Sequence, residues 1–525
     1  MQAINFSYVK DYNWTVMEKN QITNVVWFKR DLRSRDNLVL LKASKNGPIL
    51  PLYILEPELW SQGDMSYRQY TFLMDSLASL EKQLSSLNVN LVIKLGNAID
   101  VFDSLNQKNM NLEIWSYEET WNKWTFRRDL EVKKWANRNN INWREYPRNG
   151  VVRGLKTRDF WASQWYKEMK KPLVESPKSA VGIYEPSDQL PSAKALGLEY
   201  DGIYKTQNGS RIEAEKILND FLSVRGRNYN KEMSSPVTAF NSCSRLSPYL
   251  AFGVISIREV YKAIERKKLS LNEIEPSSRS GWGRSLNSYA SRLRWHCHFI
   301  QKLEDEPRIE TENLHPSFDG IREPFFDLNL FEAWKSGNTG YPMVDACMKA
   351  LIATGWLNFR MRAMLTSFAS YHLWLHWRET SLWLAKLFTD YEPGIHYSQI
   401  QMQSGTSGIN SVRIYNPIKQ GFDHDPNGEF VKSWLPSLGA MPKEYIHTPW
   451  ELPEKLNGYP YPVVEERHAR ELAAKKIYEV RKTLGFRYKA RKIYEKHGSR
   501  KRSPQNPLGK RDKISSVILQ KELPL

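Results

Sequence analysis

Residues 24–150 alternate short apolar runs with amphipathic stretches, and this alternation restricts the fold more than any other feature of the sequence. The apolar runs predict strands at 24–28, 49–55, 91–95 and 112–117, and the stretches with helical spacing predict helices at 37–45, 67–87, 98–105 and 123–137. Strands that alternate with helices form a parallel, doubly wound sheet. Neither G-x-G-x-x-G nor G-x-x-x-x-G-K-[ST] occurs, so no dinucleotide or nucleoside triphosphate site is indicated.

The 525 residues divide into an α/β part and an all-α part. Residues 172–210 are rich in Pro, Ser and Gly without helical periodicity, whereas helical spacing dominates from about residue 210 onward, including a predicted helix at 357–377. The predicted organisation is an N-terminal extension at 1–23, a Rossmann-like α/β domain at 24–155, an inter-domain linker at 156–210, a helical domain at 211–498 and a basic tail at 499–525.

Cysteine and apolar content exclude several classes of protein. No run of 18 apolar residues occurs, so no membrane span or membrane partner is expected. Cys243, Cys297 and Cys347 form no Cys-x-x-Cys pair and no even framework, so a disulfide scaffold is improbable and a four-cysteine metal site lacks its ligands. A reducing cytoplasm fits best. His372 and His376 have i,i+4 spacing, but hydrogen bonding between helices is favoured over a metal, and no metal is predicted.

Positive charge is concentrated near the C-terminus. The formal net charge is +18, and residues 467–513 contain 17 lysines and arginines against four acidic residues. A polyanion partner is the natural inference, and a solvated tail is the alternative. Leu472, Ile477, Val480 and Leu484 have the spacing of a helix face that packs on the protein, whereas the residues beyond Ser499 are predicted to be disordered.

Aromatic residues and four segments mark the helical half. The chain has 19 Trp, 26 Tyr and 20 Phe, crowded between Trp282 and Trp434, which favours a planar ligand or an electron relay over packing alone. The segments are Tyr229 followed by SCSRLSPYLAFGVIS at 242–256, RLRWHCHFIQ at 292–301, TGYPMVDACMKALIATGWLNFRMRAML at 339–365, and the sequence at 390–417. Hydroxyl groups ahead of a helix at 242–256 suit a phosphate, although ordinary helix capping needs the same residues. Residues 390–417 are predicted to form a polar, turn-rich loop.

These residues carry a resemblance. VVWFKRDLRSRDN at 25–37 resembles the opening strand and loop of the DNA photolyase/cryptochrome family, and the four segments resemble its flavin domain in the same order, with TGYP-x-VDA and W-x-x-x-R-x-R as the most specific motifs. The resemblance implies an α/β antenna domain, a long linker, an all-α domain that binds FAD, and blue-light chemistry. It leaves the antenna chromophore open among a folate, a deazaflavin, a lumazine or none.

The resemblance also assigns site residues. Arg362 and Asp390 match the pair beside the isoalloxazine, where an arginine favours anionic reduced flavin; an ordinary interhelical salt bridge is the alternative. Cys243 replaces the family's threonine, and His296 replaces an arginine near the flavin phosphates. The implied cofactor-binding set is Tyr229, Cys243, Ser244, Arg245, Leu246, Ser247, His296, Arg362, Asp390, Glu392 and His396. The implied DNA-binding set is Arg292, Trp295, Phe359, Arg360 and Met402, with Trp295 packing on the lesion.

Departures from the family pattern leave the lesion type open. Arg292 and Phe359 stand where cyclobutane enzymes have glutamate and asparagine, and Leu357 and Asn358 occupy the region of the histidines of the (6-4) enzymes. His396 stands where asparagine is usual, either exchanging a proton with the flavin or serving as a neutral hydrogen-bonding group.

The family's tryptophan relay is also altered. Trp377 matches its middle member, but Ile400 and Pro324 fall at the outer positions, so Trp374, Trp383, Tyr391 and Tyr397 become alternatives. The predicted catalytic set is Trp377, His396, Arg362 and Asp390.

The leading functional hypothesis is a photolyase that uses reduced FAD to transfer an electron to a pyrimidine dimer in UV-damaged DNA, with the cyclobutane type slightly favoured over (6-4). The lesion would be flipped out of the duplex. A cryptochrome-type photoreceptor is the main alternative, and a flavin-independent nucleic-acid binder is a weaker one. A monomer is expected in the cytoplasm, associated with the nucleoid if the chain is bacterial.

Overall fold

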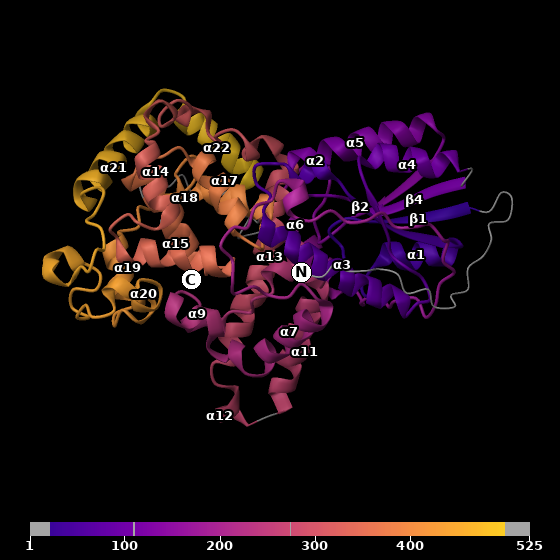
Figure 1. Cartoon of the computed structure of the whole chain (residues 1–525), viewed down its shortest axis with the longest axis horizontal. Helices are drawn as coiled ribbons and strands as arrows, with labels where there is room; N and C mark the ends of the chain where they lie inside the picture. The colour runs from indigo at the N-terminus through magenta and orange to yellow at the C-terminus, as the bar shows by residue number, and fades with distance from the viewer. Residues whose placement is uncertain (1–21, 109–110, 274, 499–525) are drawn as a thin grey trace, which may run out of the picture.

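A five-stranded, fully parallel sheet forms the N-terminal domain (Figure 1). The computed structural model describes residues 22–108, 111–273 and 275–498. The strand order is β3-β2-β1-β4-β5, which reverses direction between β1 and β4 and makes the sheet doubly wound. The predicted fold class is thereby confirmed. The strands are β1 (Ile22–Phe28), β2 (Ile49–Leu55), β3 (Val92–Leu95), β4 (Asn111–Tyr117) and β5 (Asn142–Tyr146).

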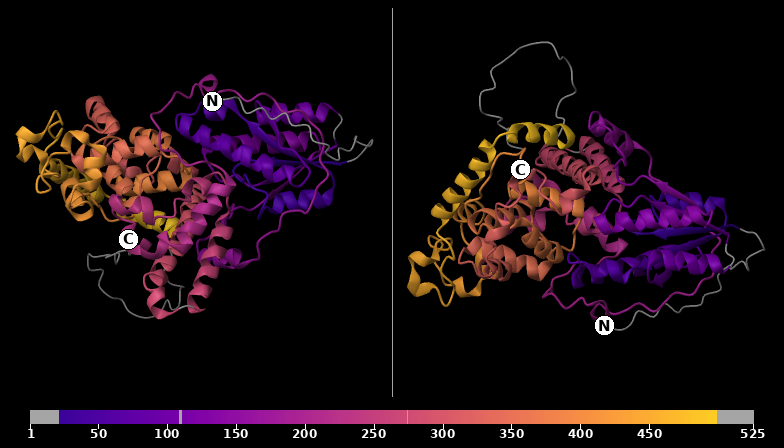
Figure 2. Two further views of the ribbon diagram at one scale, coloured as in Figure 1. Left: turned by 60° about the horizontal axis from the view of Figure 1, so that its bottom comes forward. Right: turned by 90° about the horizontal axis from the view of Figure 1, so that it is seen from above.

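Helices cover both faces of this sheet, as the view from above in Figure 2 shows. On one face, Val25 and Trp27 pack against Phe102 and Trp135 of the helices α4 and α5. On the other face, the core of Val26 and Phe28 continues through α1 and α3 into the helical domain. The helices of this domain are α1 (Leu38–Asn46), α2 (Pro57–Trp60), α3 (Tyr67–Ser85), α4 (Ala98–Gln107) and α5 (Lys123–Arg138).

Strand β5 was not predicted as a strand. Its sequence, NWREY, has no buried apolar run, and its residues are exposed or half-buried because β5 lies at the edge of the sheet. Strand β1 begins at Ile22, two residues before the predicted start. The rest of the predicted N-terminal extension lies outside the described residues.

The segment predicted as a linker runs along the α/β domain and includes a helix. Helix α6 (Trp161–Lys170) lies within 156–210 and buries Trp161, Trp165 and Met169. Gly182 forms a parallel bridge with Ile49, and the backbone amide of Asp188 donates to the carbonyl of Ile93 at 2.8 Å. Part of the predicted linker is therefore held on the edge of the sheet. It also contains the 3₁₀ turn η1 (Lys194–Leu196).

Helix α7 begins at Arg211 and opens the helical domain. The described helices of this domain are α7 (Arg211–Ser223), α8 (Tyr229–Glu232), α9 (Pro236–Ser242), α10 (Ser247–Ala251), α11 (Ile257–Ser270), α12 (Pro276–Arg279), α13 (Trp282–Asp305), α14 (Leu328–Ser336), α15 (Pro342–Thr354), α16 (Phe359–Ser367), α17 (Trp377–Leu387), α18 (Pro393–Gln403), α19 (Pro417–His424), α20 (Glu429–Trp434), α21 (Glu466–Lys482) and α22 (Phe486–His497). Short 3₁₀ turns connect them: η2 (Arg225–Asn228), η3 (Leu271–Glu273), η4 (Pro307–Glu310), η5 (Pro316–Phe318), η6 (Glu323–Phe325), η8 (Pro436–Leu438), η9 (Pro449–Glu451) and η10 (Pro453–Lys455).

The single helix predicted at 357–377 is wrong. Helix α16 continues as a π-helical turn, η7 (Phe368–His372), and the chain then leaves the helix before α17 begins at Trp377. Trp374 has the left-handed φ of 53°, and its indole N–H donates to the carbonyl of Ile321 at 3.1 Å. The helix is therefore interrupted where Trp374 contacts Ile321, and the apolar sequence of this segment does not predict the interruption.

The loop predicted at 390–417 is also corrected. Residues Pro393–Gln403 form helix α18, which packs against α13 and α16. Pro393 at the first helical position starts this helix well because its missing N–H has no partner there in any case. Polar composition suggested a loop, but the polar side chains of this helix face a cavity described below.

The two C-terminal helices lie on the outside of the helical domain (Figure 2). Ala473 and Ile477 of α21 are buried, whereas Leu472 and Leu484 are exposed, so only part of the predicted apolar face packs on the protein. The predicted basic tail at 499–525 lies outside the described residues. Within the part that the structure describes, no helix has the length and apolar character needed to cross a membrane.

Arg68 of α3 joins the two domains. Its side chain is buried, and its Nε donates to Asp201 Oδ2 at 2.7 Å. Nη1 donates to the carbonyls of Leu351 and Leu387 at 3.0 and 2.8 Å, and Nη2 donates to those of Asp201 and Ile352 at 2.9 Å each. All five guanidinium N–H groups therefore have acceptors. Since three of these carbonyls belong to the C-terminal turns of α15 and α17, the cation also meets the negative ends of two helices.

We expect Arg68→Met to lower the free energy of unfolding by about 3–5 kcal/mol, because it leaves Asp201 and buried helix-end carbonyls without their partner. Urea unfolding followed by circular dichroism measures this. Lys216→Met is the control, since Lys216 pairs with Glu213 at 3.4 Å on the surface and is expected to contribute below about 1 kcal/mol. Equal effects of the two substitutions would contradict the role of Arg68.

Candidate functional site

A cavity of about 310 Å³ lies inside the helical domain, enclosed by residues of α8, α13, α16 and α18 and by the loops 243–247 and 388–392. Its volume lies within the range of small-molecule sites. Most of the residues predicted from the sequence for the cofactor and DNA line this cavity. They are Tyr229, Cys243, Ser244, Arg245, Ser247, Arg292, Trp295, His296, Phe359, Arg360, Arg362, Asp390, Glu392 and His396.

The loop ahead of α10 presents hydroxyl groups on a constrained backbone. Arg245 has the left-handed φ of 59°, which is uncommon for a residue with a Cβ atom. Ser244 and Ser247 line the cavity on either side of it, whereas Leu246 is fully buried and is not a lining residue. Burial raises the pKa of the Cys243 thiol to about 12, so this residue stays protonated and neutral.

Arg362 and Asp390 form a forked ion pair at the cavity wall. Nη1 and Nη2 of Arg362 donate to Oδ1 and Oδ2 of Asp390 at 3.0 and 2.8 Å, and Nε donates to the carbonyl of Leu357 at 2.6 Å. The guanidinium also lies 4.0 Å from the ring centroid of Phe388. This geometry fixes the cation in the plane that a carboxylate fork requires and leaves little freedom for reorientation.

The pair depends on a close approach of two loops. Gly355 has a φ of 69°, and a Cβ atom there would lie 2.2 Å from Thr389 Oγ1. The amide of Thr389 donates to the Gly355 carbonyl at 3.0 Å. A side chain at Gly355 would therefore separate the loop before α16, which leads to Arg362, from the loop that carries Asp390.

Two histidines of the cavity wall are neutral. Burial lowers the pKa of His396 to about 3, against the opposing hydrogen bond to Ser381, and the nearby Arg362 lowers it as well. Nε2 of His396 donates to the carbonyl of Ser381 at 2.9 Å, so the proton of the neutral ring is on Nε2 and Nδ1 is an acceptor. Burial likewise lowers the pKa of His296 to about 4. The neutral hydrogen-bonding alternative for His396 is thus the one that its surroundings favour.

Glu392 is the cavity residue whose titration falls near neutral pH. Burial raises its pKa to about 7, against the opposing attraction of Arg30 and Arg148. Arg30 follows β1 and Arg148 follows β5, so the carboxyl ends of the sheet contribute charge to the wall of the helical domain. The α/β domain therefore tunes the cavity electrostatically.

Several buried polar atoms at the cavity lack a protein partner. Buried polar groups are nearly always hydrogen-bonded, so a cluster of exceptions indicates a polar ligand. The atoms are Arg245 Nε, His296 Nδ1, Asn358 Oδ1, Arg360 Nε, Glu392 Oε1 and Gln399 Oε1. Together with aromatic and aliphatic walls, this donor and acceptor set fits a large, partly planar, polar cofactor such as FAD.

Aromatic and cationic side chains of α13 and α16 gather in the same wall. The ring of Trp295 is stacked on that of Phe299 at 5.6 Å, and it meets His298 edge-on at 5.0 Å. The guanidinium of Arg292 lies 5.7 Å from the ring of Phe359. Trp295 is half-buried, so part of its ring surface is available to a ligand. Flat apolar faces beside cations suit a nucleobase and its phosphate.

Three predicted site residues, Leu246, Trp377 and Met402, do not line the cavity, and several lining residues were not predicted. Trp377 is buried behind the wall, where its indole N–H donates to Asn313 Oδ1 at 2.7 Å, and Met402 is half-buried on α18 outside the lining. Gln399 and Gln403, for example, line the cavity although they were not predicted as site residues. Their spacing of three and seven residues from His396 is that of one helix face, a signal hidden by the loop prediction at 390–417.

A buried chain of aromatic rings leads from the cavity to Trp377. Tyr391 lines the cavity and lies 5.2 Å from His396 and 6.4 Å from Tyr397, measured between ring centroids. Tyr397 lies 6.4 Å from Trp377. The hydroxyl of Tyr391 donates to Asp64 Oδ2 at 2.6 Å, which places a proton acceptor at this ring. Tyr391 and Tyr397 thus form a chain of rings between the cavity and Trp377, whereas Pro324 is exposed in η6.

The histidine pair of the sequence does not form a metal site. His372 lies in η7 and pairs with Glu466 at 3.4 Å, and His376 precedes α17 and pairs with Glu323 at 3.4 Å. Among the residues with described placement, no three His, Cys, Asp or Glu side chains are arranged to hold a metal ion.

The neutral state of His396 predicts acid sensitivity. Below about pH 6.5 the unfolded chain binds a proton that the folded chain, with a pKa of about 3, does not, so stability falls as pH decreases and is unaffected above that pH. We expect His396→Asn to recover about 2 kcal/mol of the stability lost between pH 7 and pH 5. Urea unfolding at both pH values tests this. His468→Asn, at an exposed position, is the control, and the same pH dependence in all three proteins would contradict the prediction.

Comparisons with known proteins agree on a family. A family model for "DNA photolyase" matches residues 24–159, and one for the "FAD binding domain of DNA photolyase" matches residues 289–479. The chain is 30% identical to cryptochrome-1 of Sinapis alba, over 89% of this chain and 97% of that protein. It is 29% identical to the deoxyribodipyrimidine photo-lyase of Vibrio cholerae, over 87% of this chain and 99% of that protein.

A solved structure extends the likeness to three dimensions. The bacterial class III photolyase from Agrobacterium tumefaciens aligns with a TM-score of 0.75 and 26% identity, over 89% of this chain and 99% of that one. The doubly wound sheet and the helical domain therefore have the arrangement found in that solved structure. The chain belongs to the DNA photolyase/cryptochrome family, and its helical domain is an FAD-binding domain.

Proposed function

We propose that the chain is a light-dependent DNA photolyase that repairs UV-induced pyrimidine dimers, with the cyclobutane type favoured over the (6-4) type. The observation that carries this proposal is the half-buried ring of Trp295, which is stacked on Phe299 in the wall of the FAD-domain cavity together with Arg360. A stacking face with a cation in the same wall suits a flipped dimer and its phosphate.

Residues of the cavity have distinct roles in this proposal. Ser244 and Ser247, which line the cavity at the start of α10, bind the phosphates of FAD. Arg362, fixed by Asp390, favours negative charge on the flavin ring. His396 supplies a neutral hydrogen-bonding group from α18. When bound, reduced FAD supplies on light absorption the electron that splits the dimer and that is then returned. Burial by Phe388, Leu384 and Ile395 keeps water away from this chemistry.

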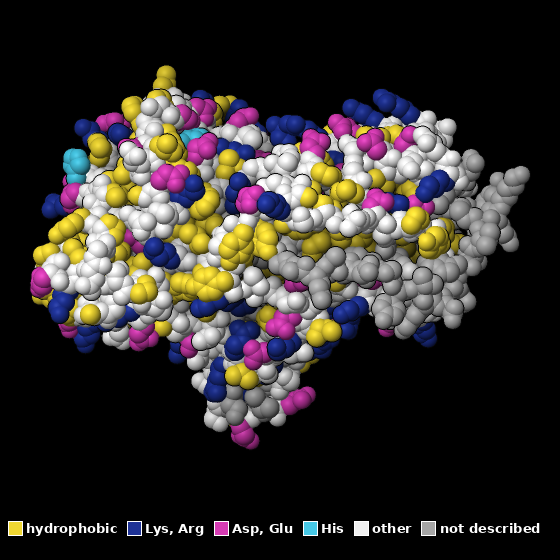
Figure 3. All heavy atoms as spheres, in the orientation of Figure 1, with side chains coloured by type: hydrophobic (Ala, Val, Ile, Leu, Met, Phe, Trp, Pro, Cys, Tyr) yellow, Lys and Arg dark blue, Asp and Glu magenta, His cyan; other side chains and the backbone are white. Residues whose placement is uncertain are grey.

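DNA contact depends on a local wall rather than on a uniformly basic surface. On the face drawn in Figure 3, cationic and acidic side chains alternate. Arg292 and Arg360 line the cavity together with Trp295, and they are the cations placed to meet phosphates beside a flipped lesion. Phosphate contacts then position the strand, while stacking on Trp295 reads the damage.

A cryptochrome-type photoreceptor is the second candidate. It is favoured by the arginine and phenylalanine at positions 292 and 359 and by the loss of the two outer relay tryptophans. The route through Tyr391 and Tyr397 would serve a receptor as well as a repair enzyme.

Illumination of the reduced, FAD-loaded protein with defined oligonucleotides separates these functions. One oligonucleotide contains a cyclobutane dimer and the other a (6-4) product, and chromatography follows the restored pyrimidines. We expect repair of the cyclobutane substrate. Repair of neither substrate, with stable FAD and a light-induced spectral change, would support the receptor instead.

Trp295→Ala is expected to weaken binding of damaged DNA by about 1–3 kcal/mol, the usual contribution of a base stacked on an aromatic ring. Binding of undamaged duplex should change little, and Trp295→Phe should keep most of the affinity. Fluorescence anisotropy with labelled duplexes measures all three. Equal losses on damaged and undamaged DNA would identify Trp295 as a packing residue.

Asp390→Asn is expected to release FAD more readily, because it removes the negative partner of a partly buried guanidinium at a cost of about 3 kcal/mol. The ratio of flavin to protein absorbance after gel filtration measures retention. Asp423→Asn is the control, since Asp423 pairs with Lys419 on the surface at 3.4 Å. Unchanged flavin content in Asp390→Asn would contradict the assignment.

A further inference from the structure

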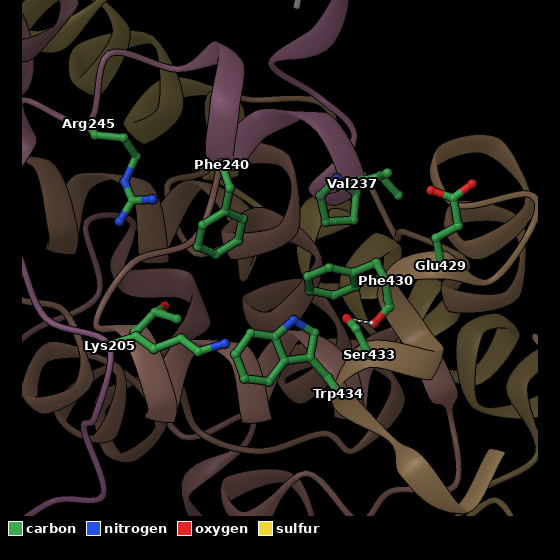
Figure 4. Close-up of a pocket in the computed structure, with 10 residues that line it drawn as sticks. Lys205, Val237, Phe240, Arg245, Glu429, Phe430, Ser433 and Trp434 are labelled. Atoms are coloured by element: carbon green, nitrogen blue, oxygen red, sulfur yellow. Dashed lines mark hydrogen bonds between the residues drawn. The ribbon is translucent and has the colours of Figure 1, made fainter. Parts of the chain in front are cut away.

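A second cavity, of about 330 Å³, lies between α9, α20 and the segment before α7 (Figure 4). Its wall contains the aromatic rings of Phe240, Phe430 and Trp434 and the cations Lys205 and Arg245. Arg245 also lines the FAD-domain cavity, so the two cavities share this side chain. The edge-on contact of Phe240 with Trp356, at 5.0 Å between centroids, joins the wall of one cavity to that of the other.

The two cations turn toward the aromatic side of this second cavity. Lys205 Nζ lies 5.0 Å from the ring centroid of Trp434, and Figure 4 shows its side chain extending toward that indole. The Arg245 guanidinium lies 4.2 Å from the ring of Trp356 and 5.0 Å from that of Phe240. Glu429 lies at the opposite end, with its carboxylate turned away from both cations (Figure 4).

Neither cation has a carboxylate partner among the described residues. Arg245 Nη2 donates to Gln207 Oε1 at 3.1 Å, but its Nε is buried without any acceptor. Burial lowers the pKa of Arg245 to about 10, because the desolvation of this cation outweighs the opposing effects of Cys243 and Asp390. An anionic group between Lys205 and Arg245 would supply the missing charge.

We infer that this cavity binds a nucleoside phosphate, with its base against Trp434 and its phosphate between Lys205 and Arg245. A base has a flat face that suits the indole of Trp434. The ring of Phe430 lies 6.4 Å from that indole at a tilt of 55°, so it closes the edge of the site. Because Lys205 and Arg245 lie beside the aromatic rings, one nucleotide can contact a ring with its base and the cations with its phosphate. A purely apolar ligand would leave both cations unpaired, and a purely anionic one would leave the Trp434 face unused.

Two sources of this ligand are distinguishable. The backbone between the cavities is short, since Ser234 lines the FAD-domain cavity while Pro236 and Val237 line the second cavity. Asn358 holds this segment by donating to the carbonyl of Ser234 at 2.8 Å. A nucleotide in the second cavity is therefore either a free mononucleotide or one unit of a strand that also reaches the first cavity. The inference does not depend on repair of dimers.

Binding of two probes to the FAD-loaded full chain tests the inference. Isothermal titration calorimetry follows thymidine 5′-monophosphate, and fluorescence anisotropy follows an undamaged, labelled single-stranded oligothymidylate. Lys205→Gln is the principal variant, because Lys205 is exposed and its replacement should not disturb folding. Trp434→Ala is the second. Lys492→Gln is the matched control, since Lys492 lies 4.5 Å from the ring of Tyr488 but outside either cavity.

We expect Trp434→Ala to weaken binding at least about fivefold, the lower end of base stacking. Lys205→Gln should weaken binding and reduce the dependence of log K on log salt by about 0.7 for the single strand. Lys492→Gln should match the parent.

A loss for the mononucleotide alone would support a site for free nucleotides, and a loss that includes the oligonucleotide would support a strand site. Parent affinity for both probes in Lys205→Gln and in folded Trp434→Ala would overturn the inference. Dimer repair under light, measured on the same variants at saturating substrate, reports separately on the proposed function.

Discussion

The position of the FAD-domain cavity depends on one buried cation, Arg68. Arg68 belongs to the α/β domain, but its guanidinium donates hydrogen bonds to carbonyls at the C-terminal ends of α15 and α17 in the helical domain. The chain leaves α15 toward Arg362 and leaves α17 toward Asp390, so the two halves of the forked ion pair start from the helix ends that Arg68 holds together. The Gly355–Thr389 contact then sets how closely these loops approach. The packing of the two domains and the geometry of the cavity are therefore coupled. A change in how the domains pack would also change the positions of Arg362 and Asp390.

Two buried arginines outside the cavity are fully or bidentately hydrogen-bonded, whereas several polar atoms of the cavity wall have no partner in the protein. Arg68 uses all its donors within the protein, and Arg211 of the helical domain is paired with Glu259 through both terminal nitrogens. The cavity wall is different, because His296, Asn358, Glu392 and Gln399 each keep a buried polar atom without a partner. Such unpaired atoms cost stability wherever they occur, and they are also present elsewhere, for example at Arg33 and Arg322. Those that line a cavity differ in that a bound ligand offsets the cost. The second cavity shows the same feature in Arg245, which is why a ligand is inferred there as well.

Helices and strands were predicted correctly where the local sequence determines them. The predictions failed where contacts with residues distant in sequence determine the structure. Buried apolar runs identified β1, β2, β3 and β4, whereas the polar edge strand β5 has no such run. The break between α16 and α17 carries no glycine or proline; instead Trp374 is placed by Arg322, Lys476 and the carbonyl of Ile321, all distant in sequence. Helix α18 was missed because its polar residues resemble a loop, although His396, Gln399 and Gln403 share a face. Most of the residues that the family resemblance assigned to the site line the cavity, but the neutral state of His396 follows only from its burial.

Charge in the cavity wall is divided between fixed and variable groups. Arg362 is locked to Asp390, and burial keeps His396 and His296 neutral well below physiological pH, so this side presents a constant charge to a ligand. Glu392 differs, because burial brings its pKa to about 7 while Arg30 and Arg148 oppose that shift. Those two arginines belong to the α/β domain and reach Glu392 only because the domains are docked. The same docking that fixes the ion pair thus sets how strongly Glu392 holds its proton. A change in how the sheet packs against the helices would therefore alter both the geometry of the Arg362–Asp390 pair and the charge of Glu392.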